Sequence, residues 1–225
     1  MFQVFREVEP ELFTELIAEM KRRPLYMNKY RANSGDGRSQ CWGIVKQRSH
    51  RYAGSRMNFE RAEIYRELLK IAARVLPPDF TWLSCQVNQN YQTAEHKDVG
   101  NKGLSAIIGF GDYVKGELVI EETPVDIKHK VVLFDGSIYN HHTRPWEGGD
   151  RFSIVFHTPA RVFKAVPTYS LIPQIEKGQE VLILREELNG LVRMWKKGYK
   201  CVFSSDGIIP QLRSRKPSLM ECLED

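Results

Sequence analysis

The stretch "LSAIIGFGDYVKGELVIEE", residues 104–122, decides the fold class of this chain. It contains two β-type runs, residues 104–110 and 116–122, separated by Gly-Asp and Lys-Gly pairs. Similar short runs bounded by turn residues lie on both sides of it, at residues 81–89, 129–134 and 151–158. Many short strands without helices between them indicate an antiparallel sandwich or barrel. The sequence therefore predicts a β core over residues 80–160.

Two amphipathic segments precede this core. Residues 10–22 place apolar side chains on one helical stripe after Pro10, and residues 59–76 do the same before Pro77-Pro78. Between them, "NSGDGRSQ" (33–40) is typical of a turn or mobile loop. We expect helices within residues 10–76 to cover one outer sheet face, which gives an α+β fold.

The length of 225 residues suits one domain with a real core plus a small appendage. We assign residues 1–165 to that domain, with helices in 10–76 and the β core in 80–160. Residues 166–225 form a basic C-terminal extension, which we expect to pack on the same domain. Its sequence suggests a strand, a short helix and another strand.

Composition and cysteine spacing point to an intracellular, reduced protein. The hydrophobic fraction of 42% fits a globular protein, and no apolar run approaches the roughly 18 residues that span a bilayer. The opening "MFQVFREVEPELF" lacks the pattern of a secretory signal. The four cysteines are widely spaced and form no Cys-x-x-Cys pair, so we expect free thiols and no membrane contact.

Positive charge is concentrated in one segment. Residues 21–61 contain eleven Lys or Arg against Asp36 and Glu60, interleaved with aromatic residues such as Trp42. Basic side chains neutralise phosphates and aromatic rings stack on bases, so this mixture suits nucleic acid. A plain solvated face over core aromatics is the more common explanation of such a pattern, so charge alone does not decide for nucleic acid.

The motif "HKD", residues 96–98, suggests a metal site. His96 and Asp98 point the same way from an extended segment because side chains alternate along a strand. A non-haem Fe(II) site needs one more imidazole, and the adjacent His141 and His142 supply candidates. Adjacent residues point to opposite sides of an extended chain, so only one of the two can bind the same ion.

A candidate anion site follows ten residues later. Arg151 and Ser153 share one face of the β-type run "RFSIV". A guanidinium fork and a hydroxyl together suit bidentate capture of a carboxylate. The order His-x-Asp, His, Arg-x-Ser on β-type segments is much more specific than the first pair alone.

With these motifs the sequence resembles the Fe(II)- and 2-oxoglutarate-dependent dioxygenases, whose core is a double-stranded β-helix of the jelly-roll, cupin-like kind. The resemblance covers roughly residues 33–160. Within that superfamily it is most similar to the branch of TET and base-J-type enzymes, whose His-x-Asp-x-x-Asn is matched by His96, Asp98 and Asn101. Their terminal Arg-x-Ser is matched by Arg151 and Ser153.

The resemblance implies a role for each site residue. Iron would be held by His96, Asp98 and His141, the last because Thr143 and Pro145 then match the family pattern. The 2-oxoglutarate would be bound by Arg151 and Ser153, with help from Asn88 or Tyr91. The base would contact Asn101 and His157. His157 stands where the family has an aromatic residue and Pro159 where it has a histidine, which leaves the identity of the base open.

The implied activity is hydroxylation of the 5-methyl group of a pyrimidine in nucleic acid, 5-methylcytosine or thymine in DNA, with Fe(II), 2-oxoglutarate and ascorbate as reductant. Two other enzymatic readings stay open: a 2-oxoglutarate dioxygenase acting on a protein side chain or small metabolite, and an AlkB-like N-demethylase. A non-enzymatic sandwich that binds nucleic acid or sugar is a third, and the complete set of ligand-type residues argues against it.

Overall fold

The computed structural model describes residues 2–27, 37–46, 52–78, 80, 82–160, 199–204 and 207–212. After a 3-10 turn at Pro10–Phe13, its helices are α1 Thr14–Arg22, α2 Met57–Glu60 and α3 Ala62–Val75. The strands are β1 Phe2–Glu7, β2 Arg38–Lys46, β3 Tyr52–Gly54, β4 Ser84–Gln89, β5 Ser105–Lys115, β6 Leu118–Ile120, β7 Thr123–Val125, β8 Lys130–Phe134, β9 His141–Thr143, β10 Trp146–His157, β11 Tyr199–Ser204 and β12 Gly207–Leu212.

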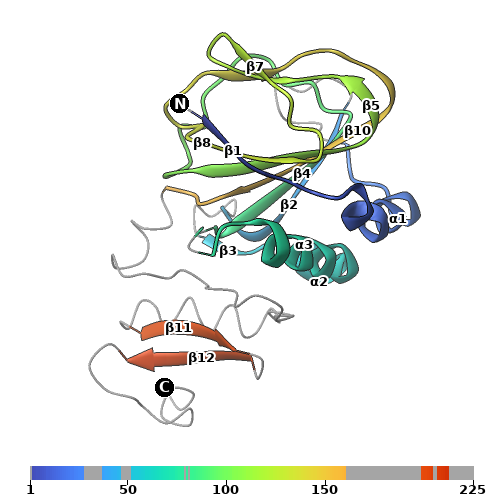
Figure 1. Ribbon diagram of the computed structural model, residues 1–225. Helices are drawn as coiled ribbons and strands as arrows, with labels where there is room; N and C mark the ends of the chain where they lie inside the picture. The colour runs from blue at the N-terminus through green and yellow to red at the C-terminus, as the bar shows by residue number, and fades with distance from the viewer. Residues whose placement is uncertain are drawn as a thin grey trace.

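Two antiparallel sheets build the core. The larger has the order β1-β8-β5-β10-β4-β2-β3 and the smaller the order β7-β6-β9. From β4 to β10 the chain passes repeatedly between the two sheets, so that most neighbours in the larger sheet are distant in sequence, whereas β6 and β7 form a hairpin in the smaller one (Figure 1). This winding is that of a double-stranded β-helix, a jelly-roll architecture, and it confirms the predicted fold class.

Strand β5 is buried on both of its faces, which explains its nearly continuous apolar sequence. Ile107 packs with residues of β6 and β8 between the two sheets. Its neighbours Ala106, Ile108 and Phe110 belong to the other core, between the larger sheet and the helices. Side chains that alternate between two apolar layers give an unbroken hydrophobic run.

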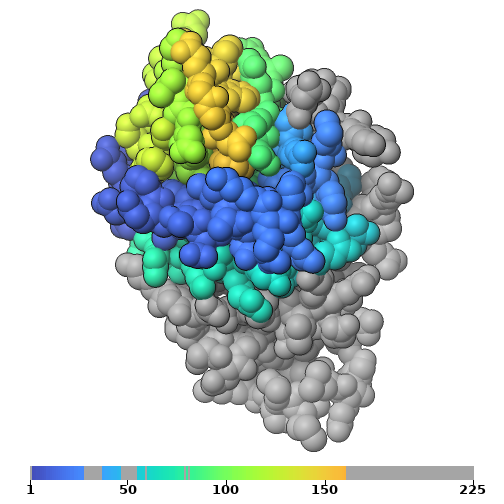
Figure 2. Space-filling view, turned by 90° about the vertical axis from the view of Figure 1, so that its right-hand side faces the viewer, coloured from blue at the N-terminus to red at the C-terminus, as the bar shows by residue number. Residues whose placement is uncertain are grey.

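The helices cover the outer face of the larger sheet, as predicted. Phe13 stacks on Phe110 of β5 with ring centroids 4.5 Å apart. The expected inward stripe of α3, which is Ile64, Leu68, Ile71 and Val75, is buried throughout. In Figure 2 the N-terminal residues with α1 form a blue band between the barrel and α3. The helices thus close one side of the sheet and leave its other face to the second sheet.

The region before residue 80 differs from the prediction. We expected helices there, but β1, β2 and β3 extend the larger sheet at its two ends. The second helix is also broken: α2 ends at Glu60, and Arg61 with φ −137° separates it from α3. Residues 33–36 of the predicted loop lie outside the described residues, and residues 38–40 belong to β2.

Only part of the predicted C-terminal extension lies within the described residues. β11 and β12 form an antiparallel pair in which Tyr199 lies opposite Leu212. Residues 161–198, including the predicted short helix, lie outside the described residues, so the domain boundary at 165 stays a prediction. Within the described ranges, no helix has the length and apolar character needed to cross a membrane.

Replacing Leu68 by Ala tests the packing of α3 on the sheet. Leu68 is fully buried, so we expect a loss of about 2–5 kcal/mol in the free energy of unfolding, measured by urea titration. The matched control is Lys70→Ala on the exposed side of the same helix, which should change it by less than about 0.5 kcal/mol. Equal losses in both variants would mean that α3 does not pack as described.

Candidate metal and anion site

A backbone bridge places the two candidate imidazoles side by side. His96 and His141 lie opposite each other, and each backbone N–H donates to the carbonyl of the other, at 3.1 and 2.9 Å. Strand β9 is itself held by β6, where Ile120 pairs with His141. The segment before β5 therefore runs beside β9, and the two rings lie with centroids 4.3 Å apart.

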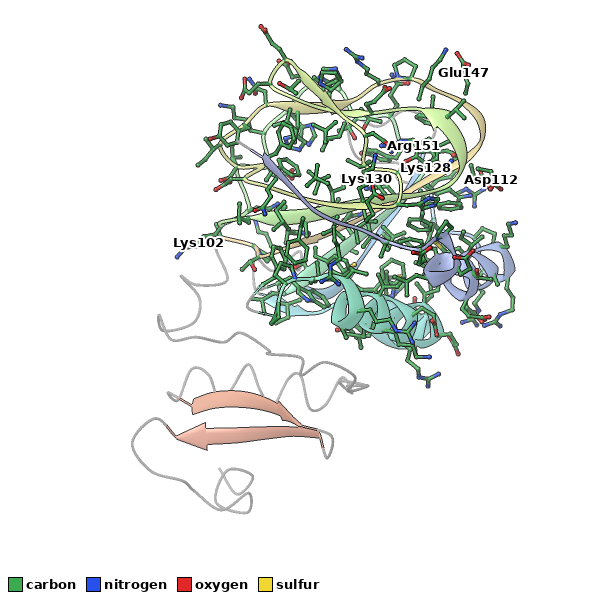
Figure 3. The ribbon with its side chains drawn as sticks, viewed as in Figure 1. Lys102, Asp112, Lys128, Lys130, Glu147 and Arg151 are labelled. Carbon is green, nitrogen blue, oxygen red and sulfur yellow. The ribbon has the colours of Figure 1, made fainter. Side chains whose placement is uncertain are left out.

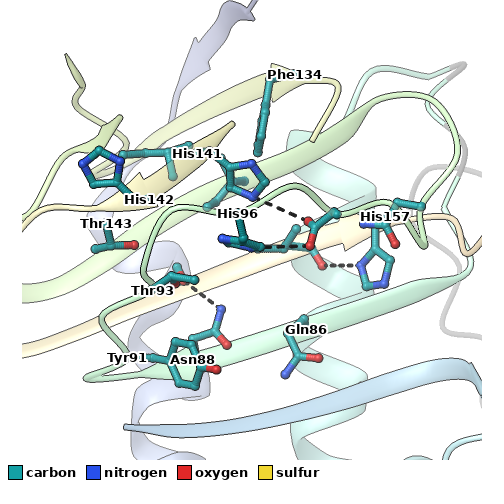
Figure 4. A pocket seen from close by; sticks show the side chains of 16 residues that line it. Gln86, Asn88, Tyr91, Thr93, His96, Phe134, His141, His142, Thr143 and His157 are labelled. Atoms are coloured by element: carbon teal, nitrogen blue, oxygen red, sulfur yellow. Dashed lines mark hydrogen bonds and ion pairs between the residues drawn. The ribbon is translucent and has the colours of Figure 1, made fainter. Parts of the chain in front are cut away.

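Asp98 completes the cluster from the turn that follows His96. Its backbone N–H donates to the carbonyl of Gly136 at 2.7 Å. The Asp98 carboxylate lies 3.5 Å from Nε2 of His96 and 3.7 Å from Nε2 of His141. One ligand atom from each of the three residues lies within 4.8 Å of the others. The structure therefore brings together the predicted triad, and Figure 4 shows its two histidines, His96 and His141, side by side.

The hydrogen bonds of both histidines leave the same nitrogen available. Nδ1 of His96 lies 2.9 Å from the carbonyl of Ala94, and Nδ1 of His141 lies 3.1 Å from the carbonyl of Tyr139. A carbonyl only accepts, so Nδ1 is the donor in each of these bonds, and Nε2 is the nitrogen that faces Asp98. Imidazoles that donate from Nδ1 to a carbonyl and present Nε2 to the site are typical metal ligands.

The charges of the cluster are mutually stabilised. A hydrogen bond with Asp98 raises the pKa of His96 against the opposing effect of burial. Burial acts to raise the pKa of Asp98, but hydrogen bonds with His141 and His96 outweigh it and hold that pKa well below its ordinary value. Asp98 is therefore an anionic oxygen donor at neutral pH, which a divalent cation requires.

Arg151 is a buried cation without a carboxylate partner among the described residues. Its side chain is only 2% exposed, and burial lowers the pKa of its guanidinium. Nε donates to the carbonyl of Gly116 at 3.1 Å, while Nη2 is buried with no hydrogen-bond partner. Figure 3 shows Arg151 inside the barrel. A buried charge without a partner is costly, so this position could hold an anionic ligand.

Tyr113 stands beside this guanidinium. The Arg151 guanidinium carbon lies 5.3 Å from the centre of the Tyr113 ring, and the Tyr113 hydroxyl is likewise buried without a partner. Burial raises the pKa of Tyr113 to about 12, so the hydroxyl is a proton donor. A Cβ at Gly116 would approach Nε of Arg151 to 3.1 Å, so a glycine there makes room for the guanidinium.

The triad opens into a cavity of about 160 Å³. It is lined by Gln86, Asn88, Tyr91, Thr93, His96, Asp98, Asn101, Ile107, Leu118, Phe134, His141, His142, Thr143, Ser153, Val155 and His157. Arg151 does not line this cavity; it lies next to it, on the same face of β10 as Ser153. The other residues predicted to bind the metal, the cosubstrate or the base, including Asn88, Tyr91, Asn101 and His157, do line it.

Gly136, Tyr113 and Gln86 are among the residues at the site that sequence reasoning missed. A Cβ at Gly136 would lie 3.2 Å from Cε1 of His141 and 3.3 Å from Asp98, so the metal ligands pack against a position without a side chain. Tyr113 alternates onto one face of β5, but only the fold places that face beside Arg151. Gln86 shares a face of β4 with Asn88, and this period of two was the available signal.

Comparisons with known proteins give structural likenesses only. No protein-family model and no curated protein matches the chain. It is similar to NgTET1 in complex with 5mC DNA, with 14% identity over 68% of this chain and 69% of that one, at a TM-score of 0.48. It is also similar to a 2OG-Fe(II) oxygenase family oxidoreductase from Burkholderia pseudomallei (16% identity, 64% and 77% covered, TM-score 0.44). A third is a Pseudomonas putida prolyl-4-hydroxylase (16%, 71% and 91%, TM-score 0.44).

At these identities the likenesses concern the fold. What the chain itself provides is a double-stranded β-helix whose two imidazoles and one carboxylate form a His-Asp-His cluster. Such a 2-His-1-carboxylate set is the facial triad of non-haem Fe(II) oxygenases, which leaves open positions for further ligands. The residues present therefore fit Fe(II), and the unpaired Arg151 fits the carboxylate of a second ligand next to it.

Proposed function

We propose that this protein is an Fe(II)- and 2-oxoglutarate-dependent dioxygenase that hydroxylates the 5-methyl group of a pyrimidine base in nucleic acid. The observation that carries the proposal is the His96–Asp98–His141 cluster with the buried, unpaired Arg151 beside it. The cluster alone would indicate only a metal site, and Arg151 alone would indicate only an anion site. Together they match a reaction that needs both a bound metal ion and an acidic cosubstrate next to it.

The three ligands would hold Fe(II) through Nε2 of each histidine and the Asp98 carboxylate. When bound, iron and 2-oxoglutarate supply the activation of O₂ for attack on a C–H bond. One oxygen atom enters the methyl group, giving a hydroxymethyl group. The other enters 2-oxoglutarate, which leaves as succinate and CO₂.

Arg151 and Ser153 would bind the far carboxylate of 2-oxoglutarate. Nη2 of Arg151 and the hydroxyl of Tyr113 are both buried donors without partners, so a carboxylate there would satisfy two groups at once. Asn88 donates from Nδ2 to Ser153 Oγ at 3.2 Å, which leaves the Ser153 hydroxyl hydrogen for the ligand. Tyr91, buried at the cavity wall, would shield this end from water.

The other end of the cavity would receive the base. Asn101 and His157 line it and supply polar groups for the edge of a flat ring. A methyl group in a duplex cannot reach a buried metal, so the nucleotide would have to flip out of the stack. Exposed Lys97 and Lys102 flank the turn from Asp98 to Asn101 and would contact phosphates next to the target base.

The basic segment 21–61 gives less support than its composition suggests. Of its described basic residues, Arg22 and Arg56 pair with glutamates of their own helices or turns. Arg38 donates to the carbonyl of Leu25, and Arg61 lies over the ring of Tyr26. These groups hold the chain's own structure, so the phosphate contacts of the proposal rest mainly on the turn around the site.

Mass spectrometry of digested DNA tests the proposed function. The protein is incubated with Fe(II), 2-oxoglutarate, ascorbate and a duplex that contains 5-methylcytosine or thymine, with cytosine or uracil duplexes as matched controls. We expect a hydroxymethyl nucleoside and one succinate for each, with a rate that falls as salt rises. Succinate without any altered nucleoside would move the substrate to a protein side chain or small metabolite.

A further inference from the structure

A row of hydrogen-bonded polar side chains crosses the floor of the cavity. Ser39 of β2, Asn88 of β4 and Ser153 of β10 stand opposite one another in the register of three neighbouring strands. Gln86 lies two residues before Asn88 and so on the same face of β4. The row connects the end of the cavity beside Arg151 with the end beside His157.

The hydrogen bonds of this row run in one direction. Gln86 donates from Nε2 to Ser39 Oγ, and Ser39 donates from its hydroxyl to Asn88 Oδ1 at 2.6 Å. Asn88 donates from Nδ2 to Ser153 Oγ at 3.2 Å. A hydroxyl has a single hydrogen and an amide nitrogen cannot accept, so each bond fixes the direction of the next.

The cosubstrate explains why the row runs this way. The reversed row would make Ser153 donate to Asn88, which would turn the Ser153 lone pairs toward a bound carboxylate and repel it. If Ser153 donates to the carboxylate of 2-oxoglutarate, as in the proposed function, Asn88 must donate to Ser153. The orientation of the Gln86 amide is then set by a ligand at the far end of the row.

This orientation leaves Oε1 of Gln86, a side chain of the cavity lining, as an acceptor. Gln86 lines the cavity, and no described residue donates to that oxygen. In Figure 4 its side chain stands between those of Asn88 and His157. An acceptor held in place inside a partly enclosed site favours a ligand that brings a hydrogen-bond donor and disfavours one that brings an acceptor.

We propose that Gln86 selects the target base, by accepting a hydrogen bond from an exocyclic amino group, so that 5-methylcytosine is oxidised in preference to thymine. The inference rests on the proposed function. Next to its methyl-bearing carbon, 5-methylcytosine carries the N4 amino donor, whereas thymine carries the O4 acceptor. With the methyl group directed at the metal, the substituent on the next ring carbon distinguishes the two bases. Oε1 of Gln86 would accept a hydrogen bond from the N4 amino group of 5-methylcytosine and would repel the O4 oxygen of thymine.

Competition between the two bases tests this. Duplexes identical except for 5-methylcytosine or thymine at one position are mixed, and kcat/KM is obtained for each from the hydroxymethyl nucleosides formed. We expect the wild-type protein to prefer 5-methylcytosine at least about tenfold, the effect of one unmet hydrogen bond in an enclosed site. Gln86→Met, of similar size but without the amide, should reduce that ratio to near one with the KM for 2-oxoglutarate unchanged.

Ser39→Ala is the second and sharper variant. Ser39 is buried and does not line the cavity, so its loss removes no contact with substrate. It frees the Gln86 amide to turn its nitrogen toward the base, and the preference should fall mainly through a gain on thymine. The control is Gln92→Met, at an exposed glutamine outside the cavity, which should keep the wild-type ratio.

The outcomes separate this inference from the proposed function. Equal rates on the two bases in the wild-type protein, or a ratio that survives in both Gln86→Met and Ser39→Ala, would overturn the role of Gln86 and leave a base oxygenase. Turnover of 2-oxoglutarate without oxidation of either base would overturn both. Thermal unfolding and succinate formed without nucleic acid show that each variant is folded and loaded, so a lost ratio is not a lost fold.

Discussion

Replacing His141 by Ala is expected to lower succinate formation by more than about 100-fold, whereas replacing the adjacent His142 leaves metal binding intact. His141 is opposite His96 in a backbone bridge, and its Nε2 lies 3.7 Å from Asp98. Among the residues that the structure describes, His142 belongs to no such cluster of ligand atoms. Changes to residues that only orient metal ligands already cost 10–100-fold, so the loss of a ligand should cost more.

His141→Ala and His142→Ala are a matched comparison because both variants remove an imidazole from the same short strand, β9. Iron content after dialysis against Fe(II) without oxygen, together with succinate formation, distinguishes them. His96→Ala and Asp98→Ala should behave like His141→Ala. If His142→Ala loses its iron and His141→Ala keeps it, the assignment of the third ligand is wrong.

Arg151→Met should weaken the use of 2-oxoglutarate and at the same time stabilise the unliganded protein. Removing one partner of a buried charge pair costs about 2–5 kcal/mol, so the KM for 2-oxoglutarate should rise at least about 30-fold. Without the ligand, the same substitution removes a buried charge that has no carboxylate partner among the described residues, and its replacement by an apolar side chain is neutral or stabilising by about 1–4 kcal/mol.

Thermal unfolding with and without 2-oxoglutarate measures both effects. The wild-type melting temperature should rise with the ligand, since ligands that bind only the folded state stabilise it. The Arg151→Met protein should begin higher and rise less. Arg151→Lys keeps the charge but not the planar fork and should lie between them. An unchanged KM in Arg151→Met would remove the anion site from the account.

The β core was predictable because the hydrophobic pattern of its strands indicates which of their residues are buried. β5 and β8 are apolar on consecutive positions, and β10 alternates in a way that set Arg151 and Ser153 on one face. β1, β2 and β3 were missed because their places in the sheet depend on pairing with neighbouring strands and not on a pattern of their own. The side chains of β1, for example, are mostly exposed, and the strand is held by pairing with β8.

The candidate site was likewise predictable only in part. His96 and Asp98 are two residues apart, so their convergence follows from strand geometry alone. His141 could be expected near them only by resemblance, because the bridge to His96 depends on the whole winding of the chain. The row from Gln86 to Ser153 depends on the register of three strands, one of which, β2, no sequence pattern had indicated.

The central claim is that the triad and Arg151 form one site for Fe(II) and 2-oxoglutarate. Calorimetric titration of Fe(II) into the metal-free protein without oxygen, in the presence and absence of 2-oxoglutarate, tests it most directly. The account predicts one Fe(II) for each chain, bound more tightly with 2-oxoglutarate present, and loss of that enhancement in Arg151→Met while iron still binds. Iron binding that is indifferent to 2-oxoglutarate in the wild-type protein, or that survives in Asp98→Ala, would contradict it.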